Sequence, residues 1–304
     1  MKVIQVMTRN NENFYNLNLN LSSQLVMFLS VLKWKSFGYT VKLYVDDYFK
    51  QIFTENGLIN LYDEVDDKYF VENNLYEEYN INKKYFWAFS KLFVYLNEKD
   101  NFIMSDLDFI PLKDFHDIID ENKNYVYYRE IIDEILYPNN DKLKSASDYT
   151  FPEWMTWKEN PVNTAIVYLA DKKLKDLYIS EAIRYAQNNN ITDNDPYNRN
   201  MIFAEQRLLS ECAKYLNIDL NSIKSNYETI CNPREIHYYC YKIVDAKKNN
   251  LDNWVLYLLD KLYQEFNDVY SNVIELPEYA IYKDIINSKG FEYRIPKPLL
   301  RTKW

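Results

Sequence analysis

Glycine is scarce in this chain of 304 residues, which contains only Gly38, Gly57 and Gly290. An average protein has ~7% glycine. The chain therefore has neither the GxGxxG turn of dinucleotide-binding folds nor a GxxxxGK phosphate loop. A bound phosphate group cannot be held in a glycine-rich nest of backbone N–H groups, and must be neutralised by a metal ion or by Lys and Arg side chains.

Cysteine is also infrequent, with Cys212, Cys231 and Cys240 as the only examples. An odd number without a CxxC pair gives no disulfide framework and suits a reducing compartment. The spacing of Cys231, His237 and Cys240 matches no zinc-binding pattern. We therefore expect buried thiols.

Long apolar runs and an excess of positive charge are missing as well. The longest apolar run, Leu25 to Leu29, is far shorter than the ~20 residues that span a bilayer. Residues Met1 to Met7 lack the charged-then-apolar layout of a signal peptide. The net charge of -9 disfavours nonspecific binding to nucleic acid or anionic membranes. We expect a soluble, cytoplasmic protein.

Apolar residues make up 47% of the chain, enough for a large core. Their spacing predicts alternating strands and helices, and hence an α/β fold with one main domain in residues 1–250. Residues 251–304 are predicted to form a helical C-terminal extension that ends in a basic arm from Ser288. Predicted strands are 2–7, 40–46, 101–105, 125–129, 162–169 and 230–241. Predicted helices include 47–56, 173–188, 201–216 and 252–270, with one more lined by Leu25, Phe28, Leu29 and Leu32, another lined by Phe86, Phe89, Phe93 and Leu96, and a long loop over 131–161.

Two acids at the end of a predicted strand are the most informative feature. Asp106 and Asp108 flank Leu107 directly after the apolar run 102–105. In an extended strand both carboxylates point the same way, while Leu107 points into the core. Such a pair repels unless it shares a proton, meets cations or holds a metal ion. We favour the metal ion.

This apolar-Asp-x-Asp-apolar pattern, followed by Pro111-Leu112, resembles the DxD motif of nucleotide-sugar glycosyltransferases with the GT-A fold, and among them the glycogenin-like (GT8) group. The resemblance implies a Rossmann-like mixed sheet flanked by helices. It also implies that Asp106 and Asp108 hold Mn2+ or Mg2+, which bridges the diphosphate of a UDP-sugar. Resemblance to this group further implies a hexosyltransferase that retains the anomeric configuration.

Further segments follow in the order that this family shows. Ser90-Lys91-Leu92 resembles the helix whose basic residue reaches the donor phosphates, and Thr8 and Lys242 are assigned to the donor site in the same way. Asn163-Thr164-Ala165 resembles the Asn-Ser/Thr-Gly turn that contacts the donor sugar, with Ala in place of Gly. A solvated lysine at Lys91 and a plain turn at Asn163 are the alternatives.

Two more matches lie in the second half of the chain. Glu205-Gln206 resembles the Asp-Gln pair near the anomeric carbon, and the alternative is a first-turn Glu that complements a helix dipole. His237 resembles the late His that completes the metal site, although Cys240 stands where the family has Gly. The alternative for His237 is a core histidine. The other histidine, His116, is expected in a surface helix.

Together these features predict a metal-dependent glycosyltransferase that moves a sugar from a UDP-sugar to an acceptor hydroxyl, with Asn163, Glu205 and Gln206 as catalytic candidates. We expect the acceptor to be a glycan or glycoconjugate, on whose rings Trp154 and Trp157 could stack. Two alternatives stay open. One is a catalytically degenerate GT-A scaffold that binds sugar nucleotides or glycans, and the other is a nucleotidyltransferase.

Overall fold

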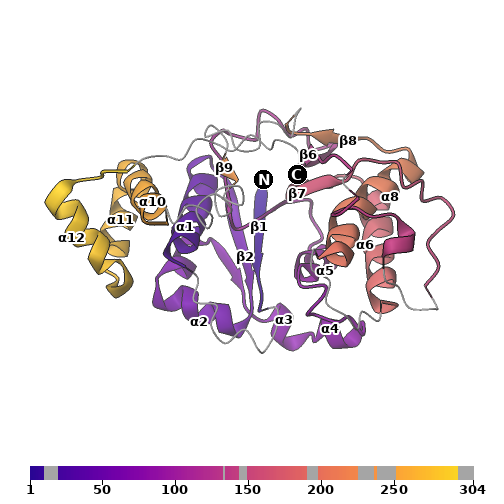
Figure 1. Ribbon diagram of the computed structural model, residues 1–304, viewed down its shortest axis with the longest axis horizontal. Coiled ribbons are helices and arrows are strands. Elements are labelled where there is room, and N and C mark those ends of the chain that lie inside the picture. Colours follow the sequence, from indigo (N-terminus) through magenta and orange to yellow (C-terminus); the bar gives the residue numbers. More distant parts are fainter. Residues whose placement is uncertain are drawn as a thin grey trace.

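The computed structural model describes residues 1–9, 20–132, 134–143, 149–189, 198–224, 236–237 and 251–293, with the backbone alone at Leu251 and at 236–237 (Figure 1). Its centre is a seven-stranded sheet in the order β3-β2-β1-β4-β7-β6-β8. The strands are β1 (Lys2–Met7), β2 (Thr40–Val45), β3 (Glu64–Asp66), β4 (Ile103–Ser105), β6 (Asn124–Arg129), β7 (Val162–Tyr168) and β8 (Leu220–Ser222).

The sheet is mixed because one strand runs against the others. β1 pairs in parallel with β2 and β4, and β2 with β3, whereas β7 is antiparallel to both β4 and β6. The predicted parallel β1–β2 unit and the mixed sheet are confirmed. A consequence is that the beginning of β7 lies at the same edge of the sheet as the carboxyl end of β4.

Helices cover both faces of the sheet, as Figure 1 shows. Successive strand residues alternate between the two faces, so Val3 and Ile103 belong to one core, and Ile4 and Met104 to the other. The first core includes α1 (Leu21–Ser36), α2 (Asp47–Glu55) and α10 (Leu251–Glu265). The second includes α5 (Phe89–Asn97), α6 (Lys172–Gln187) and α8 (Leu208–Leu216).

Shorter helices also occur among the described residues. They are η1 (Leu58–Leu61), α3 (Tyr69–Glu72), α4 (Leu75–Glu78), η2 (Asn140–Lys142), α7 (Arg199–Ile202), α11 (Asn267–Val273), η5 (Pro277–Tyr279) and α12 (Ala280–Lys289). None of the described helices is both long and apolar enough to cross a membrane.

The helical C-terminal extension is confirmed, and it packs on the outer side of α1. Leu258 and Leu262 of α10 are fully buried in the core that contains α1, and Lys33 forms an ion pair with Glu265 at 2.8 Å. The single helix expected over 252–270 is instead two helices, because Phe266 leaves the helical conformation at φ -145° and packs against this core.

Most predicted elements agree with the structure, but some do not. Leu96, expected on the apolar face of α5, is 47% exposed, and His116 lies in a turn rather than a helix, where its ring stacks on Tyr39. Cys212 is buried as expected. Of the predicted strand 230–241, only β9 (Ile236–His237) lies within the described residues, and Cys231, Cys240 and most of the basic arm lie outside them.

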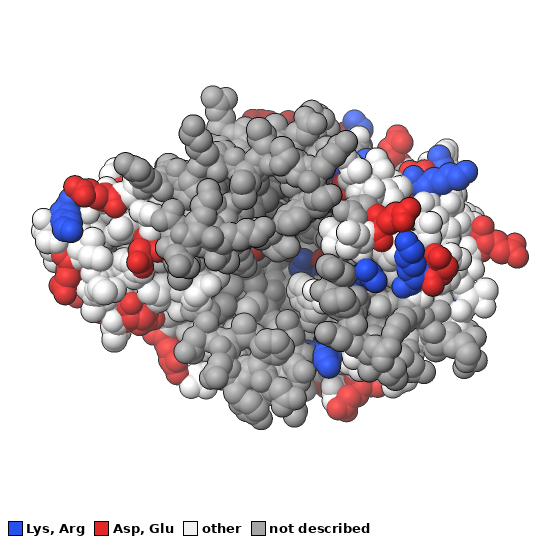
Figure 2. Space-filling model, in the orientation of Figure 1, with Lys and Arg blue, Asp and Glu red and all other residues white. Residues whose placement is uncertain are grey.

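Charged side chains lie at several places on the face of the molecule that Figure 2 presents. Figure 2 shows acidic and basic groups interspersed on this face, without a continuous basic tract in its described part.

Candidate functional site

The two acids lie in a tight turn between β4 and β5 (Phe109–Ile110). β4 ends at Ser105, and the N–H of Phe109 donates to the carbonyl of Asp106 at 3.1 Å. The expectation that Asp106 and Asp108 lie in an extended strand is therefore wrong, since a turn sets the directions of their side chains. Leu107 does point into the core, as expected, and both acids are half-buried.

The turn is fixed to the two strands that flank β4. The N–H of Asp106 donates to the carbonyl of Ala165 on β7 at 2.9 Å. On the other side, the buried amide of Gln5 on β1 donates to the carbonyl of Asp106 at 3.4 Å. Because these contacts hold the backbone of Asp106 from both sides, its carboxylate has a defined position at the carboxyl edge of the sheet.

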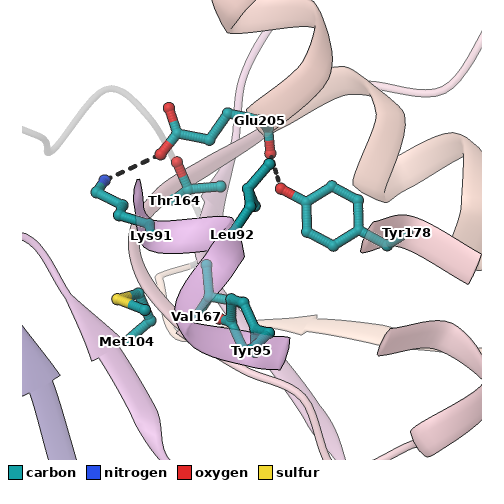
Figure 3. Close-up of a pocket in the computed structure, with 8 residues that line it drawn as sticks. All are labelled: Lys91, Leu92, Tyr95, Met104, Thr164, Val167, Tyr178 and Glu205. Carbon is teal, nitrogen blue, oxygen red and sulfur yellow. Dashed lines mark hydrogen bonds and ion pairs between the residues drawn. The ribbon is translucent and has the colours of Figure 1, made fainter. Parts of the chain in front are cut away.

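Lys91 brings a positive charge to this carboxylate. Lys91 lies in the first turn of α5. In the same turn, the backbone N–H of Ser90 donates to the hydroxyl of Tyr76 at 3.0 Å. The ammonium of Lys91 forms an ion pair with Asp106. It forms a second ion pair with Oε1 of Glu205 at 2.9 Å, which Figure 3 shows. The three side chains are 18%, 23% and 9% exposed, so Lys91 is not the solvated surface lysine of the alternative interpretation.

The electrostatics of this cluster keep Lys91 charged. Burial alone would lower the pKa of Lys91, but the carboxylates of Asp106 and Glu205 outweigh it and raise the pKa well above its usual range. The ammonium has three N–H donors and two carboxylate partners here. Among the described residues, one donor therefore remains for a further anionic group.

Glu205 lies in the middle of a helix, not at its start. The helix predicted over 201–216 consists of α7, a π turn over Phe203–Arg207, and α8. The alternative interpretation, a first-turn Glu that complements a helix dipole, is therefore wrong. The carbonyl of Glu205 accepts a hydrogen bond from the hydroxyl of Tyr178 on α6 at 2.8 Å, as Figure 3 shows.

Asn163 lies within β7 rather than in a turn before it. Its amide donates to the hydroxyl of Tyr128 at 3.1 Å and to Glu130 at 3.4 Å, and its Oδ1 accepts from the N–H of Ala165 at 3.0 Å. The pairing register between β6 and β7 shifts here, because Val126 pairs with Val167 whereas Tyr128 pairs with Asn163.

Thr164 is the member of this triplet that faces the lysine. It lines a small cavity together with Lys91 and Glu205, while the amide of Asn163 bonds to β6. The sequence pattern matches the whole triplet to a turn that contacts the donor sugar, but it singles out Asn163 and not Thr164 as the catalytic candidate. The only feature of the sequence that indicates Thr164 is its position as a polar residue next to the matched Asn163.

The side chain of Gln206 bonds to the long loop over 131–161 and not to Lys91. Its Oε1 accepts from the hydroxyl of Tyr137 at 2.6 Å. The adjacent, fully buried Arg207 donates to the carbonyls of Tyr137, at 2.8 Å, and of Trp157. The π turn therefore carries Glu205 toward Lys91 and, through the next two residues, anchors the loop predicted to lie over the site.

The tryptophans of that loop are half-buried, and each has a protein partner. Trp157 stacks on Phe203 with ring centroids 5.6 Å apart, and Trp154 stacks on Tyr215 at 4.8 Å. One face of each ring thus contacts another aromatic side chain of the protein. Their contact with an acceptor stays a prediction.

The remaining candidates are placed only in part. β9 pairs with β5 so that His237 lies opposite Phe109, the residue after Asp108, but the side chain of His237 and all of Lys242 lie outside the described residues. Thr8 is buried at the end of β1, and its hydroxyl has no hydrogen-bond partner among the described residues. No cluster of three or more His, Cys, Asp or Glu that could hold a metal ion occurs among the described residues.

No protein-family model and no curated protein sequence matches this chain. Among solved structures, "PaToxG Glycosyltransferase" is similar over 92% of this chain and 84% of its own, with 14% identity and a TM-score of 0.37. Mouse xyloside xylosyltransferase 1 in its apo form is similar over 73% of this chain and 84% of its own, with 10% identity and a TM-score of 0.39. Similarity at this level says nothing about the chemistry of the chain.

Proposed function

We propose that the chain is a metal-dependent glycosyltransferase that moves a sugar from a UDP-sugar to an acceptor hydroxyl. One observation carries the proposal. Lys91, Asp106 and Glu205 were selected from three separate segments by their resemblance to one family, and their side chains meet at the carboxyl edge of the sheet. Ligands bind at this edge in open α/β sheets.

The residues present suit a divalent ion. The turn after β4 supplies two carboxylates, which are oxygen ligands of the kind that Mn2+ and Mg2+ prefer, and the backbone of His237 lies beside this turn. We assign Asp106, Asp108 and His237 as ligands. The ion would neutralise charge on the departing UDP.

Lys91 would bind the donor diphosphate directly. Its position in the first turn of α5 adds the positive end of the helix dipole to the charge of the ammonium. The N–H that is not used by Asp106 or Glu205 can donate to a phosphate oxygen. Thr8, with its buried hydroxyl, and Lys242 would complete the donor site.

Glu205 would act on the sugar itself. A carboxylate held near the anomeric carbon stabilises the positive charge of an oxocarbenium-like transition state. Asn163 and Gln206 would contact the donor sugar after exchanging their present partners, Tyr128 and Tyr137. We propose that the anomeric configuration is retained and that the acceptor is a glycan or glycoconjugate.

The test is a screen of sugar nucleotides for slow hydrolysis in Mn2+, Mg2+ and EDTA. We expect one UDP-sugar to be hydrolysed only with a metal ion, and the Asp106→Asn protein to be inactive. Asp176→Asn is the control, because Asp176 is a solvent-exposed acid that pairs with Lys172 on α6. Metal-independent hydrolysis, or equal activity of Asp106→Asn and Asp176→Asn, would contradict the proposal.

A further inference from the structure

We propose that Tyr178 is a positioning residue that holds Glu205 against Lys91 by securing the π turn. Its part in catalysis rests on the function proposed above. Tyr178 lies on α6, on the far side of Glu205 from Lys91, and is 2% exposed.

Glu205 is held at two points, one on its backbone and one on its side chain. The hydroxyl of Tyr178 donates to its carbonyl at 2.8 Å, and its carboxylate accepts from Lys91 at 2.9 Å. Figure 3 shows these two contacts on opposite sides of the residue. The hydrogen bond from Tyr178 fixes the backbone of Glu205, and the ion pair with Lys91 fixes its carboxylate.

The π turn makes the backbone contact important. In this turn the N–H of Leu208 bonds to the carbonyl of Phe203, one residue further than in an α-helix. If the turn relaxed to α-helical geometry, the register would shift by one residue, which is a rotation of about 100° around the helix axis. Such a rotation would carry the carboxylate of Glu205 away from Lys91.

Tyr178 is suited to prevent this relaxation. Burial raises the pKa of its phenol well above the usual value, so the hydroxyl stays a neutral donor. The hydroxyl reaches a carbonyl inside the π turn, and its ring packs in the core between α6 and α8. Loss of the hydroxyl would leave a buried carbonyl without this donor.

The experiment compares Tyr178→Phe with a matched control, Tyr185→Phe. Tyr185 lies on the same helix, is fully buried, and donates to the side-chain Oδ1 of Asn200 on α7, three residues before the π turn begins at Phe203. Both variants lose a buried hydrogen bond that a phenol of α6 donates, to the backbone carbonyl of Glu205 in Tyr178→Phe and to the side chain of Asn200 in Tyr185→Phe. Only Tyr178→Phe loses the bond to Glu205.

Two measurements follow for each variant. Amide hydrogen exchange reports on the π turn without reference to function, and we expect exchange over residues 203–208 to be about tenfold faster in Tyr178→Phe than in Tyr185→Phe. In metal-dependent hydrolysis of the donor, we expect kcat of Tyr178→Phe to fall about tenfold while KM stays within about twofold.

The outcomes separate this inference from the proposed function. Equal exchange over 203–208 in the two variants would overturn the role of Tyr178 at the π turn, whatever the enzyme does. Faster exchange with kcat equal to that of Tyr185→Phe would overturn its positioning role. If the wild-type protein hydrolysed no sugar nucleotide, the proposed function would fail, and the exchange result would still decide whether Tyr178 secures the turn.

Discussion

Lys91 and Glu205 are separated by 114 residues and form an ion pair at 2.9 Å, with Asp106 on the same ammonium. Removal of the lysine leaves two partly buried carboxylates without their cation. We expect Lys91→Met to lower the free energy of unfolding by about 2 kcal/mol, less than for a fully buried pair because some solvent reaches these groups. Urea denaturation measures this, with the exposed Lys173 as control in Lys173→Met.

The same variant should lose nucleotide binding. If Lys91 donates to the diphosphate, calorimetry should find UDP binding at least tenfold weaker in Lys91→Met than in Lys173→Met. A variant that is destabilised but binds UDP normally would show that Lys91 only neutralises the two acids.

Asp108 should matter for the metal ion more than for the fold. We expect Asp108→Asn to abolish Mn2+-dependent UDP binding and to leave the melting temperature in EDTA unchanged or raised, since the substitution removes one of two neighbouring negative charges. Thermal denaturation with EDTA and with Mn2+ tests this. A large loss of stability in EDTA would mark Asp108 as a structural residue.

How much of this site could be predicted depends on the kind of interaction. Strands β1, β2 and β7 are short apolar runs, and the sequence indicates them directly. β3 and β8 contain three residues each, with acids or polar side chains, and they pair at the two edges of the sheet, so no local pattern marks them. The antiparallel direction of β7 follows from chain connections and not from its residues.

The sequence predicts the members of the charged cluster as separate candidate residues, but not that they contact one another. Lys91, Asp106 and Glu205 could be matched to motifs, but their contacts arise from the packing of α5 and the π turn on the sheet. The π turn adds one residue to a helical repeat, which apolar spacing over 201–216 does not reveal. Tyr178 was missed because it looked like any aromatic residue on the buried side of a helix.

Glu98 gives a pH-dependent contribution to stability away from the site. Burial alone would raise its pKa, but hydrogen bonds from Lys42 and Tyr44 lower it below the usual value. A carboxyl with a lowered pKa stabilises the fold above its unfolded-state pKa of ~4.3, and this contribution is lost as the pH falls through the lower folded-state value.

We therefore expect Glu98→Gln to be less stable than wild type at pH 7, with a difference that shrinks below pH ~4. Urea denaturation at both pH values measures it. Glu64→Gln is the control, since Glu64 pairs with Lys2 at the same edge but is far more exposed. A difference for Glu98→Gln that does not change with pH would contradict this explanation.

His237 is the third proposed metal ligand, and its backbone lies opposite Phe109. We expect His237→Ala to weaken Mn2+-dependent UDP binding by ~1 kcal/mol or more. If His237 is instead a core histidine, His237→Ala should lower the melting temperature in EDTA and leave the Mn2+ dependence of UDP binding intact. His116→Ala is the control, because His116 lies at the exposed turn and stacks on Tyr39.

The most direct test of the proposed function is calorimetry of UDP binding with Mn2+ and with EDTA. In a chain without a glycine-rich phosphate loop, Asp106 and Asp108 can attract a diphosphate only through a cation. We predict that UDP binds at least tenfold more tightly with Mn2+, and that the difference disappears in Asp108→Asn. Equal affinity in Mn2+ and EDTA would contradict a metal-dependent donor site.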